Sequence, residues 1–197
     1  MRRSSLLAAL AAIGAPALLA AQTPAAAPPE RTGFWISVGL GGGPKWLSCD
    51  VCTDDFGNGA AGDFALGGTV DPQWLVGADI VGFFPWAGMD EGYGDNSDGF
   101  GAVLFSARHY PRVEKGLFLT GGLGMGQIDV KQDLLRAKGF VGKVGIGCDL
   151  RAGRNFSFTP MLSLVQSFAT ELDREGERVD GSMNFGMATL GVSLTWH

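Results

Sequence analysis

The chain is built from stretches in which apolar and polar residues alternate, and this period of two constrains the fold more than any other feature of the sequence. Because successive side chains of an extended strand point to opposite faces, such alternation predicts β-strands with one apolar face. We predict eight strands, over about residues 33–41, 61–71, 73–84, 99–110, 116–128, 139–150, 155–168 and 183–196. Most exceed the ~5–6 residues usual in globular sheets and approach the ~9–11 residues of a strand that crosses a bilayer.

The connections between these strands alternate in length. Short connections are predicted at 71–73, 111–115 and 151–155, and long ones at 42–60, 85–98, 129–138 and 169–182. Short turns at one end and long loops at the other are typical of membrane barrels. The pattern predicts an all-β fold, an eight-stranded antiparallel up-and-down transmembrane β-barrel over residues 33–197. Closure of such a barrel pairs every backbone polar group without leaving an open edge.

The two faces of the predicted strands carry different side chains. One face is apolar and free of charge, as Leu190, Val192 and Leu194 illustrate in the last strand. The other face is rich in glycine and holds the charges that fall within strands, which are Asp63, Asp79, Arg108, Lys143 and Asp149. Eight strands enclose room for about one layer of side chains. We therefore expect the bulky apolar face to meet lipid and the smaller polar face to line the lumen.

The five inward charges admit two interpretations. An unpaired charge is costly in a narrow interior, which favours a network of ion pairs that plugs the barrel. The alternative is a polar pore whose selectivity these charges set. We favour the plug because eight strands leave little open cross-section.

Aromatic residues on the apolar face gather at both ends of the predicted strands. At the short-turn end these are Phe34, Trp74, Phe156 and Trp196, and at the long-loop end Phe64, Phe84, Phe140 and Phe168. Two such rings predict the aromatic girdles that mark the two membrane–water interfaces.

The N-terminal segment has the three parts of a secretory signal peptide. Arg2 and Arg3 are followed by an apolar stretch over residues 6–19 and then by small residues. The stretch is shorter than the ~20 residues of a membrane-spanning helix. We predict a signal peptide over residues 1–21, followed by a Pro/Ala-rich leader over residues 22–32.

Two features of the long loops suggest further chemistry. Cys49 and Cys52 lie in a Gly/Asp-rich loop without the additional ligands of a zinc site, so we expect a loop disulfide in an oxidising compartment. The acidic residues Asp90, Glu91, Asp95 and Asp98 are a weak candidate for binding a divalent cation. They lack the spacing of an EF-hand, and a solvated loop explains them more simply, so we assign no metal.

Charge and histidine content argue against two classes of function. The sequence has 15 Lys+Arg and 20 Asp+Glu, a formal net charge of −5, and no basic stripe that would bind nucleic acid. Acyl chemistry needs a Ser or Cys nucleophile beside a histidine base. The two histidines, His109 and His197, fall at the short-turn end without such a neighbour. We expect neither catalysis nor a cofactor.

The last strand, ATLGVSLTWH (188–197), has large apolar residues at alternate positions up to Trp196. It is similar to the C-terminal signal by which the barrel-assembly machinery recognises its clients, although that signal usually ends on the aromatic residue and here His197 follows. With the strand pattern, residues 33–197 resemble the small eight-stranded outer-membrane barrels of the OmpA/OmpX/OmpW-like group. The resemblance implies export to the outer membrane of a Gram-negative-type bacterium, contact with outer-membrane lipid and lipopolysaccharide, and assembly through residues 188–197.

These observations predict a non-catalytic outer-membrane barrel with a structural or surface-interaction role and a plugged lumen, as the resemblance to OmpA also implies. A narrow porin-like channel for small or hydrophobic solutes is the alternative that the resemblance to OmpW implies. A soluble lipocalin-like binder is a third possibility, which the assignment of the faces opposes. The sequence identifies no ligand for the outer loops.

Overall fold

The structure is a computed structural model that describes residues 31–50, 54–85, 99–130, 135–174 and 177–197. Its elements are β1 (Phe34–Cys49), β2 (Asp55–Asp71), β3 (Trp74–Pro85), β4 (Gly99–His109), the 3-10 turn η1 (Val113–Lys115), β5 (Leu117–Val130), β6 (Leu135–Cys148), β7 (Leu150–Arg151), β8 (Phe156–Arg174), β9 (Glu177–Val179) and β10 (Met183–Trp196). The predicted signal peptide and most of the predicted leader lie outside the described residues. Among the described residues, no helix is long and apolar enough to cross a membrane.

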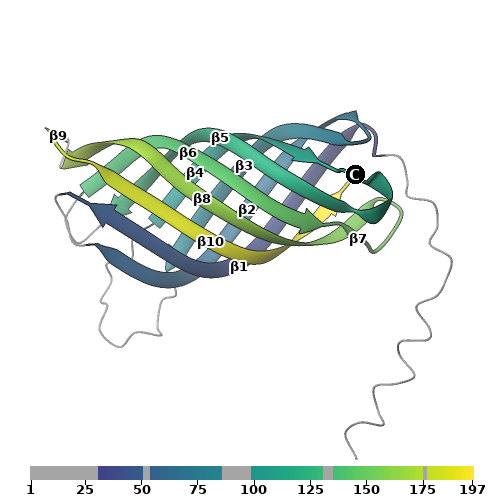
Figure 1. Cartoon of the computed structure of the whole chain (residues 1–197), viewed down its shortest axis with the longest axis horizontal. Coiled ribbons are helices and arrows are strands. Elements are labelled where there is room, and N and C mark those ends of the chain that lie inside the picture. Colours follow the sequence, from purple (N-terminus) through teal and green to yellow (C-terminus); the bar gives the residue numbers. More distant parts are fainter. Residues whose placement is uncertain (1–30, 51–53, 86–98, 131–134, 175–176) are drawn as a thin grey trace, which may run out of the picture.

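The strands form one closed antiparallel barrel (Figure 1). Consecutive long strands pair with each other, and β10 returns to pair with β1, for example Val38 with Leu194. The two short strands do not add to the number of strands in the barrel wall. β7 follows β6 directly after Asp149, and β9 pairs only with the end of β8. Within the described residues the barrel therefore has eight staves, which confirms the predicted fold.

The staves extend further toward the long-loop end than the sequence predicts. β1 continues to Cys49 and β2 begins at Asp55, so most of the connection expected over 42–60 is a paired hairpin. β8 likewise continues to Arg174, with a register shift where it pairs with β6 at Gly139 and Phe140. The extensions are strands because their inward side chains, such as Lys45 and Leu47, are buried inside the barrel.

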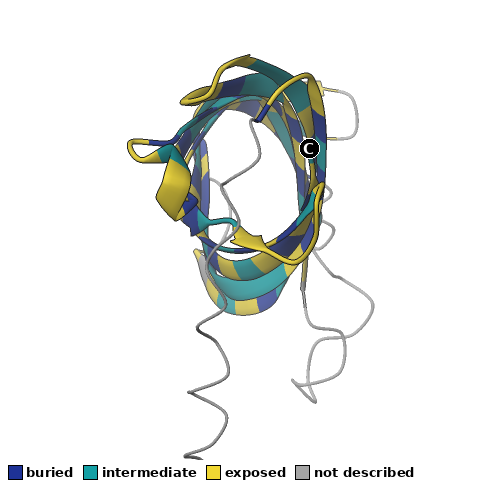
Figure 2. Cartoon of the chain, turned by 90° about the vertical axis from the view of Figure 1, so that its right-hand side faces the viewer, coloured by how far each residue is buried: buried dark blue, intermediate teal, exposed yellow. Residues whose placement is uncertain are grey.

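The side chains follow the predicted alternation. On the outer wall, Leu190 is 68% exposed and Leu40 is 76% exposed, whereas inward Asp79 is only 3% exposed. Figure 2, which looks into the end that carries the short turns, shows buried and exposed residues alternating along the staves. An exposed apolar outer wall around buried charges is the arrangement of a barrel surrounded by lipid.

Outward aromatic residues lie near both ends of the barrel. Phe156 and Phe168 stand on β8 twelve residues apart (168 − 156), which is about 30 Å along the axis of a barrel whose strands tilt by about 40°. Trp46 joins the ring at the loop end, where its indole N–H donates a hydrogen bond to Gln166 Oε1 at 3.2 Å. Phe64 was expected at the long-loop end of its strand. It lies instead in the middle of β2, opposite Val38 and Ile80, because β2 begins earlier than predicted.

The lumen as candidate functional site

Buried side chains inside the barrel lie in three layers along its axis. Toward the short turns lies a cluster of Trp35, Ala65, Leu75, Tyr110, Phe118 and Met161, which we call the turn-end cluster. Toward the long loops lies a larger apolar group, the loop-end cluster, which includes Leu47, Phe83, Phe100, Leu104, Phe185 and Met187. Between the two lies a polar layer built around Asp63, Asp79, Lys143, Ser163 and Thr189.

An ion pair crosses the polar layer. The ammonium group of Lys143 on β6 donates a hydrogen bond to Asp79 Oδ2 on β3, with 2.6 Å between the two atoms. β3 and β6 are separated by β4 and β5 in the barrel, so the ion pair connects two strands that are not neighbours. Both side chains are at least 96% buried, so the dielectric screening of water is largely excluded.

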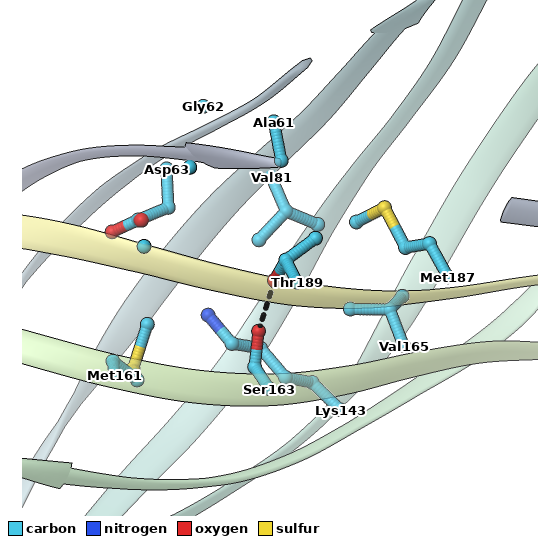
Figure 3. A pocket seen from close by; sticks show the side chains of 12 residues that line it. Ala61, Gly62, Asp63, Val81, Lys143, Met161, Ser163, Val165, Met187 and Thr189 are labelled. Atoms are coloured by element: carbon cyan, nitrogen blue, oxygen red, sulfur yellow. Dashed lines mark hydrogen bonds between the residues drawn. The ribbon is translucent and has the colours of Figure 1, made fainter. Parts of the chain in front are cut away.

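Small residues and hydroxyl groups complete this layer (Figure 3). Ser163 and Thr189, on the neighbouring strands β8 and β10, hydrogen-bond through their hydroxyl oxygens at 2.7 Å. Asp63 on β2 reaches into the space over Gly39, where a Cβ atom would collide with its carboxylate and with the Ser193 hydroxyl. Glycine at position 39 is therefore what makes room for a charged side chain inside the barrel.

Two small cavities lie in the lumen. The cavity beside Asp63, Lys143, Ser163 and Thr189 has a volume of about 20 Å³, and a second among the loop-end residues has about 10 Å³. A void needs roughly 10–15 Å³ by this measure to hold one water molecule. The larger cavity thus has the size of about one water.

Arg108 lies beside the turn-end cluster, on the short-turn side of the polar layer. Its guanidinium carbon stands 4.4 Å from the ring centre of Trp35 and 5.3 Å from that of Phe118. Arg108 Nη1 has no hydrogen-bond partner among the described residues. Cation–π contacts of this kind are strong when they are desolvated, so the aromatic rings carry much of the stabilisation of this buried charge.

Asp149 gathers a separate set of partners at the turn end of the lumen. Its carboxylate accepts hydrogen bonds from the Tyr110 hydroxyl and the Thr159 hydroxyl, both at 2.8 Å, and from Arg31 Nη2 at 3.2 Å. The Arg31 guanidinium also lies over the Tyr110 ring, 3.7 Å from its centre. His197 Nε2 stands 3.7 Å from the same carboxylate. Residues close to both ends of the barrel sequence thus meet at one buried acid.

These contacts determine the protonation of the group. Burial alone would raise the pKa of Asp149, but His197, Thr159, Tyr110 and Arg31 outweigh it and hold the pKa at about 2. Burial, and then the adjacent carboxylate, raises the pKa of Tyr110 above its usual value. Asp149 is therefore ionised and Tyr110 neutral at ordinary pH.

The loop-end cluster is a packed aromatic core. The rings of Phe100 and Phe185 stack with 4.5 Å between their centres, and Phe83 meets Phe185 edge-on at 6.3 Å. A Cβ atom at position 59 would collide with the Phe83 ring, so glycine at this position leaves the space that the ring occupies. These rings lie inside the barrel, on the loop-end side of the polar layer.

The five charges predicted to line the lumen do point inward, but they fall into separate groups. Asp79 and Lys143 pair, Asp63 lies near them, Arg108 lies on aromatic rings, and Asp149 joins Arg31. Sequence reasoning missed Arg31, Tyr110 and the inward aromatic rings. Arg31 falls within the predicted leader, and the inward rings Trp35 and Phe83 directly adjoin outward Phe34 and Phe84, so that alternation is hidden.

Two predicted loop features fall on residues that the structure does not describe. Cys52 and the acidic residues Asp90, Glu91, Asp95 and Asp98 lie outside the described residues, so the disulfide with Cys49 stays a prediction. Within the described part of the chain, no group of three or more His, Cys, Asp or Glu side chains could hold a metal ion.

A closed eight-stranded barrel with an apolar outer wall defines the class as a transmembrane β-barrel, and solved structures of this class match the fold. The barrel is similar to Ail, the attachment invasion locus protein of Yersinia pestis, with 14% identity over 84% of this chain and 99% of that chain and a TM-score of 0.54. It is equally similar to Neisserial surface protein A, with 10% identity, coverage of 82% and 96%, and a TM-score of 0.54. A second structure of Ail, in complex with the heparin analogue sucrose octasulfate, matches at 12% identity, coverage of 83% and 99%, and a TM-score of 0.51. No protein-family model matches the sequence, and no curated protein matches it. The fold is that of the small outer-membrane barrels.

Proposed function

We propose that this protein is a non-catalytic barrel of the bacterial outer membrane, with a structural or surface-interaction role and a lumen closed by its own side chains. The observation that carries the proposal is the layered lumen, in which an ion pair is enclosed between two apolar clusters. Water-sized voids support closure, because a hydrated ion needs a continuous path several times wider.

The outward side of the protein supports the membrane location. Its exposed apolar wall and its aromatic residues near both ends match the hydrocarbon core and interfaces of a bilayer. We propose that the chain is exported by residues 1–21, assembled through its last strand by the barrel-assembly machinery, and surrounded by outer-membrane lipid and lipopolysaccharide. The similar barrel Ail has been solved in complex with the heparin analogue sucrose octasulfate, and we infer that this chain likewise meets a partner outside the membrane.

The histidines have surroundings that favour structural roles. His109 stacks on Trp74 with 4.4 Å between ring centres, and His197 lies beside Asp149. Among the described residues, neither of these contacts joins a histidine to a Ser or Cys side chain that could act as the nucleophile of acyl chemistry, which supports the non-catalytic assignment.

Conductance in planar bilayers tests the closed lumen against the narrow channel. We expect the folded wild-type barrel to give no single-channel steps, and Lys143→Met to remain silent because the apolar clusters still fill both ends. Replacing Trp35 and Phe118 with alanine removes two large rings of the turn-end cluster, and we expect this variant to stay silent as well because the loop-end cluster is unchanged. Steady ohmic steps from the wild type, in protein that shifts on heating in gels as a folded barrel does, would contradict the proposal and favour the porin-like alternative.

A further inference from the structure

Basic side chains at the two ends of the barrel differ in their partners. Near the loop end, Arg136 pairs with Asp129 at 2.6 Å and Arg178 pairs with Glu171 at 2.7 Å. At the turn end, four exposed bases occupy the connections after β4 and β6: Arg112, Lys115, Arg151 and Arg154. None of these four side chains makes a hydrogen bond or an ion pair within the described residues.

The two connections lie side by side. The Asp149 backbone N–H donates a hydrogen bond to the Gly116 carbonyl, and the Cys148 thiol lies 3.8 Å from the Lys115 carbonyl. Gly116 has a positive φ of 70°, which ends η1 and directs the chain into β5 beside Asp149. The four bases therefore form one patch, which we call the basic rim.

Charge on the basic rim is not balanced by its own acids. The only acidic residues in these two connections are Glu114 and Asp149, and Asp149 is buried against Arg31. That leaves four bases to one exposed acid. An anion beside the rim would reduce the repulsion among these four bases.

Apolar side chains lie directly above the rim on the outer wall. Leu117 and Leu150, the first strand residues after Lys115 and Asp149, are about half exposed and point outward. Leu119 and Ile146 continue this surface and are paired with each other across β5 and β6. An acyl chain lying on these leucines would place its headgroup at the level of Lys115 and Arg151.

We propose that the basic rim binds the headgroups of anionic phospholipids in the leaflet that adjoins the short turns. Charge complementarity identifies the occupant, since the rim presents unpaired cations at headgroup depth beneath an apolar wall. Each base near an anionic lipid surface is worth about 1 kcal/mol, or about fivefold in affinity. The inference rests on the proposed membrane location and adds a lipid specificity to it.

Spin-labelled lipids test the proposal with the full barrel folded into phosphatidylcholine bilayers. The fraction of label immobilised at the protein gives the relative association constant of phosphatidylglycerol over phosphatidylcholine. We expect a ratio of about 5 for the wild type, falling toward 1 at high salt. The variant R112Q/K115Q/R151Q/R154Q is expected to give a ratio of about 1 at low salt.

A matched control removes four bases from the other end. The variant R136Q/K138Q/R174Q/R178Q loses the same charge, and we expect it to keep the wild-type ratio. Equal ratios in the wild type and the turn-end variant, or an equal loss in the control, would overturn the proposal. Failure of the wild type to fold into vesicles would instead overturn the membrane location itself, so the two failures are distinguishable by the heat-dependent gel shift of folded barrels.

Discussion

Replacing Lys143 with methionine tests the energetics of the polar layer. The substitution keeps the length of the side chain but removes the ammonium group that donates to Asp79 Oδ2 at 2.6 Å. Asp79 Oδ1 has no other partner within the described residues, so the carboxylate is left buried with no hydrogen bond. Asp63 adds a second carboxyl group nearby. Removing one partner of a buried ion pair typically costs about 3–5 kcal/mol, and we expect a loss in this range.

A second substitution separates charge from packing. Asp79→Asn in the Lys143→Met background removes the stranded charge at nearly constant volume, and we expect it to restore about half or more of the lost stability. Lys138→Met changes an exposed lysine on the same strand and serves as the control, with an expected effect within about 0.5 kcal/mol.

The assay is equilibrium unfolding by urea in detergent micelles or vesicles, followed by tryptophan fluorescence and the gel shift on heating. A loss of unfolding free energy below about 1 kcal/mol for Lys143→Met would contradict a buried ion pair at this position, because removing one partner of such a pair typically costs about 3–5 kcal/mol. A double variant as unstable as the sum of the two single variants would refute it as well, since the two sites would then be uncoupled.

Three further substitutions test other parts of the barrel. Gly186→Val should lower stability by about 1–3 kcal/mol, because a Cβ atom there collides with the Trp46 ring and would displace it from Gln166; the loss should nearly vanish when Trp46 is already alanine. Asp149 has a folded pKa of about 2, below its unfolded value of 3.8, so its stabilisation of about 2 kcal/mol is present above pH 4 and is lost as the pH falls toward 2. Asp149→Asn should remove most of the pH dependence of the unfolding free energy over that interval. An unchanged dependence on pH would count against the contacts assigned to the Asp149 carboxylate. Leu123→Arg places a charge on the outer wall and should cost about 2–4 kcal/mol in a bilayer, whereas Leu123→Phe should be nearly neutral.

The fold was accessible from the sequence because lipid and lumen impose a strict period of two. Along β10, Leu190, Val192 and Leu194 alternate with Thr189, Gly191 and Ser193, so both the strand and its faces are determined by local pattern. The outer parts of β1 and β2 were hidden for a physical reason. Their many glycines give no alternation, and they are held as strands by cross-strand pairing that the closed barrel provides.

The candidate site was only partly accessible. The inward direction of Asp79 and Lys143 follows from parity, but their pairing depends on which strands face each other across the lumen. The apolar clusters escaped detection because Trp35 and Phe83 sit beside outward aromatic residues, so both faces of the strand read as apolar there. Arg31 precedes the first strand, and nothing in its local sequence indicates that it turns back to Asp149.

Spin-label accessibility along β10 reports which face of the barrel meets lipid. In a background with Cys49, Cys52 and Cys148 replaced by serine, single cysteines at positions 188 to 194 would carry a nitroxide in the bilayer-embedded protein. We expect high accessibility to lipid-soluble oxygen at Ala188, Leu190, Val192 and Leu194, and low values at the positions between them. Low oxygen accessibility at the even positions together with high accessibility at Thr189 and Ser193 would contradict the assignment of the apolar face to lipid.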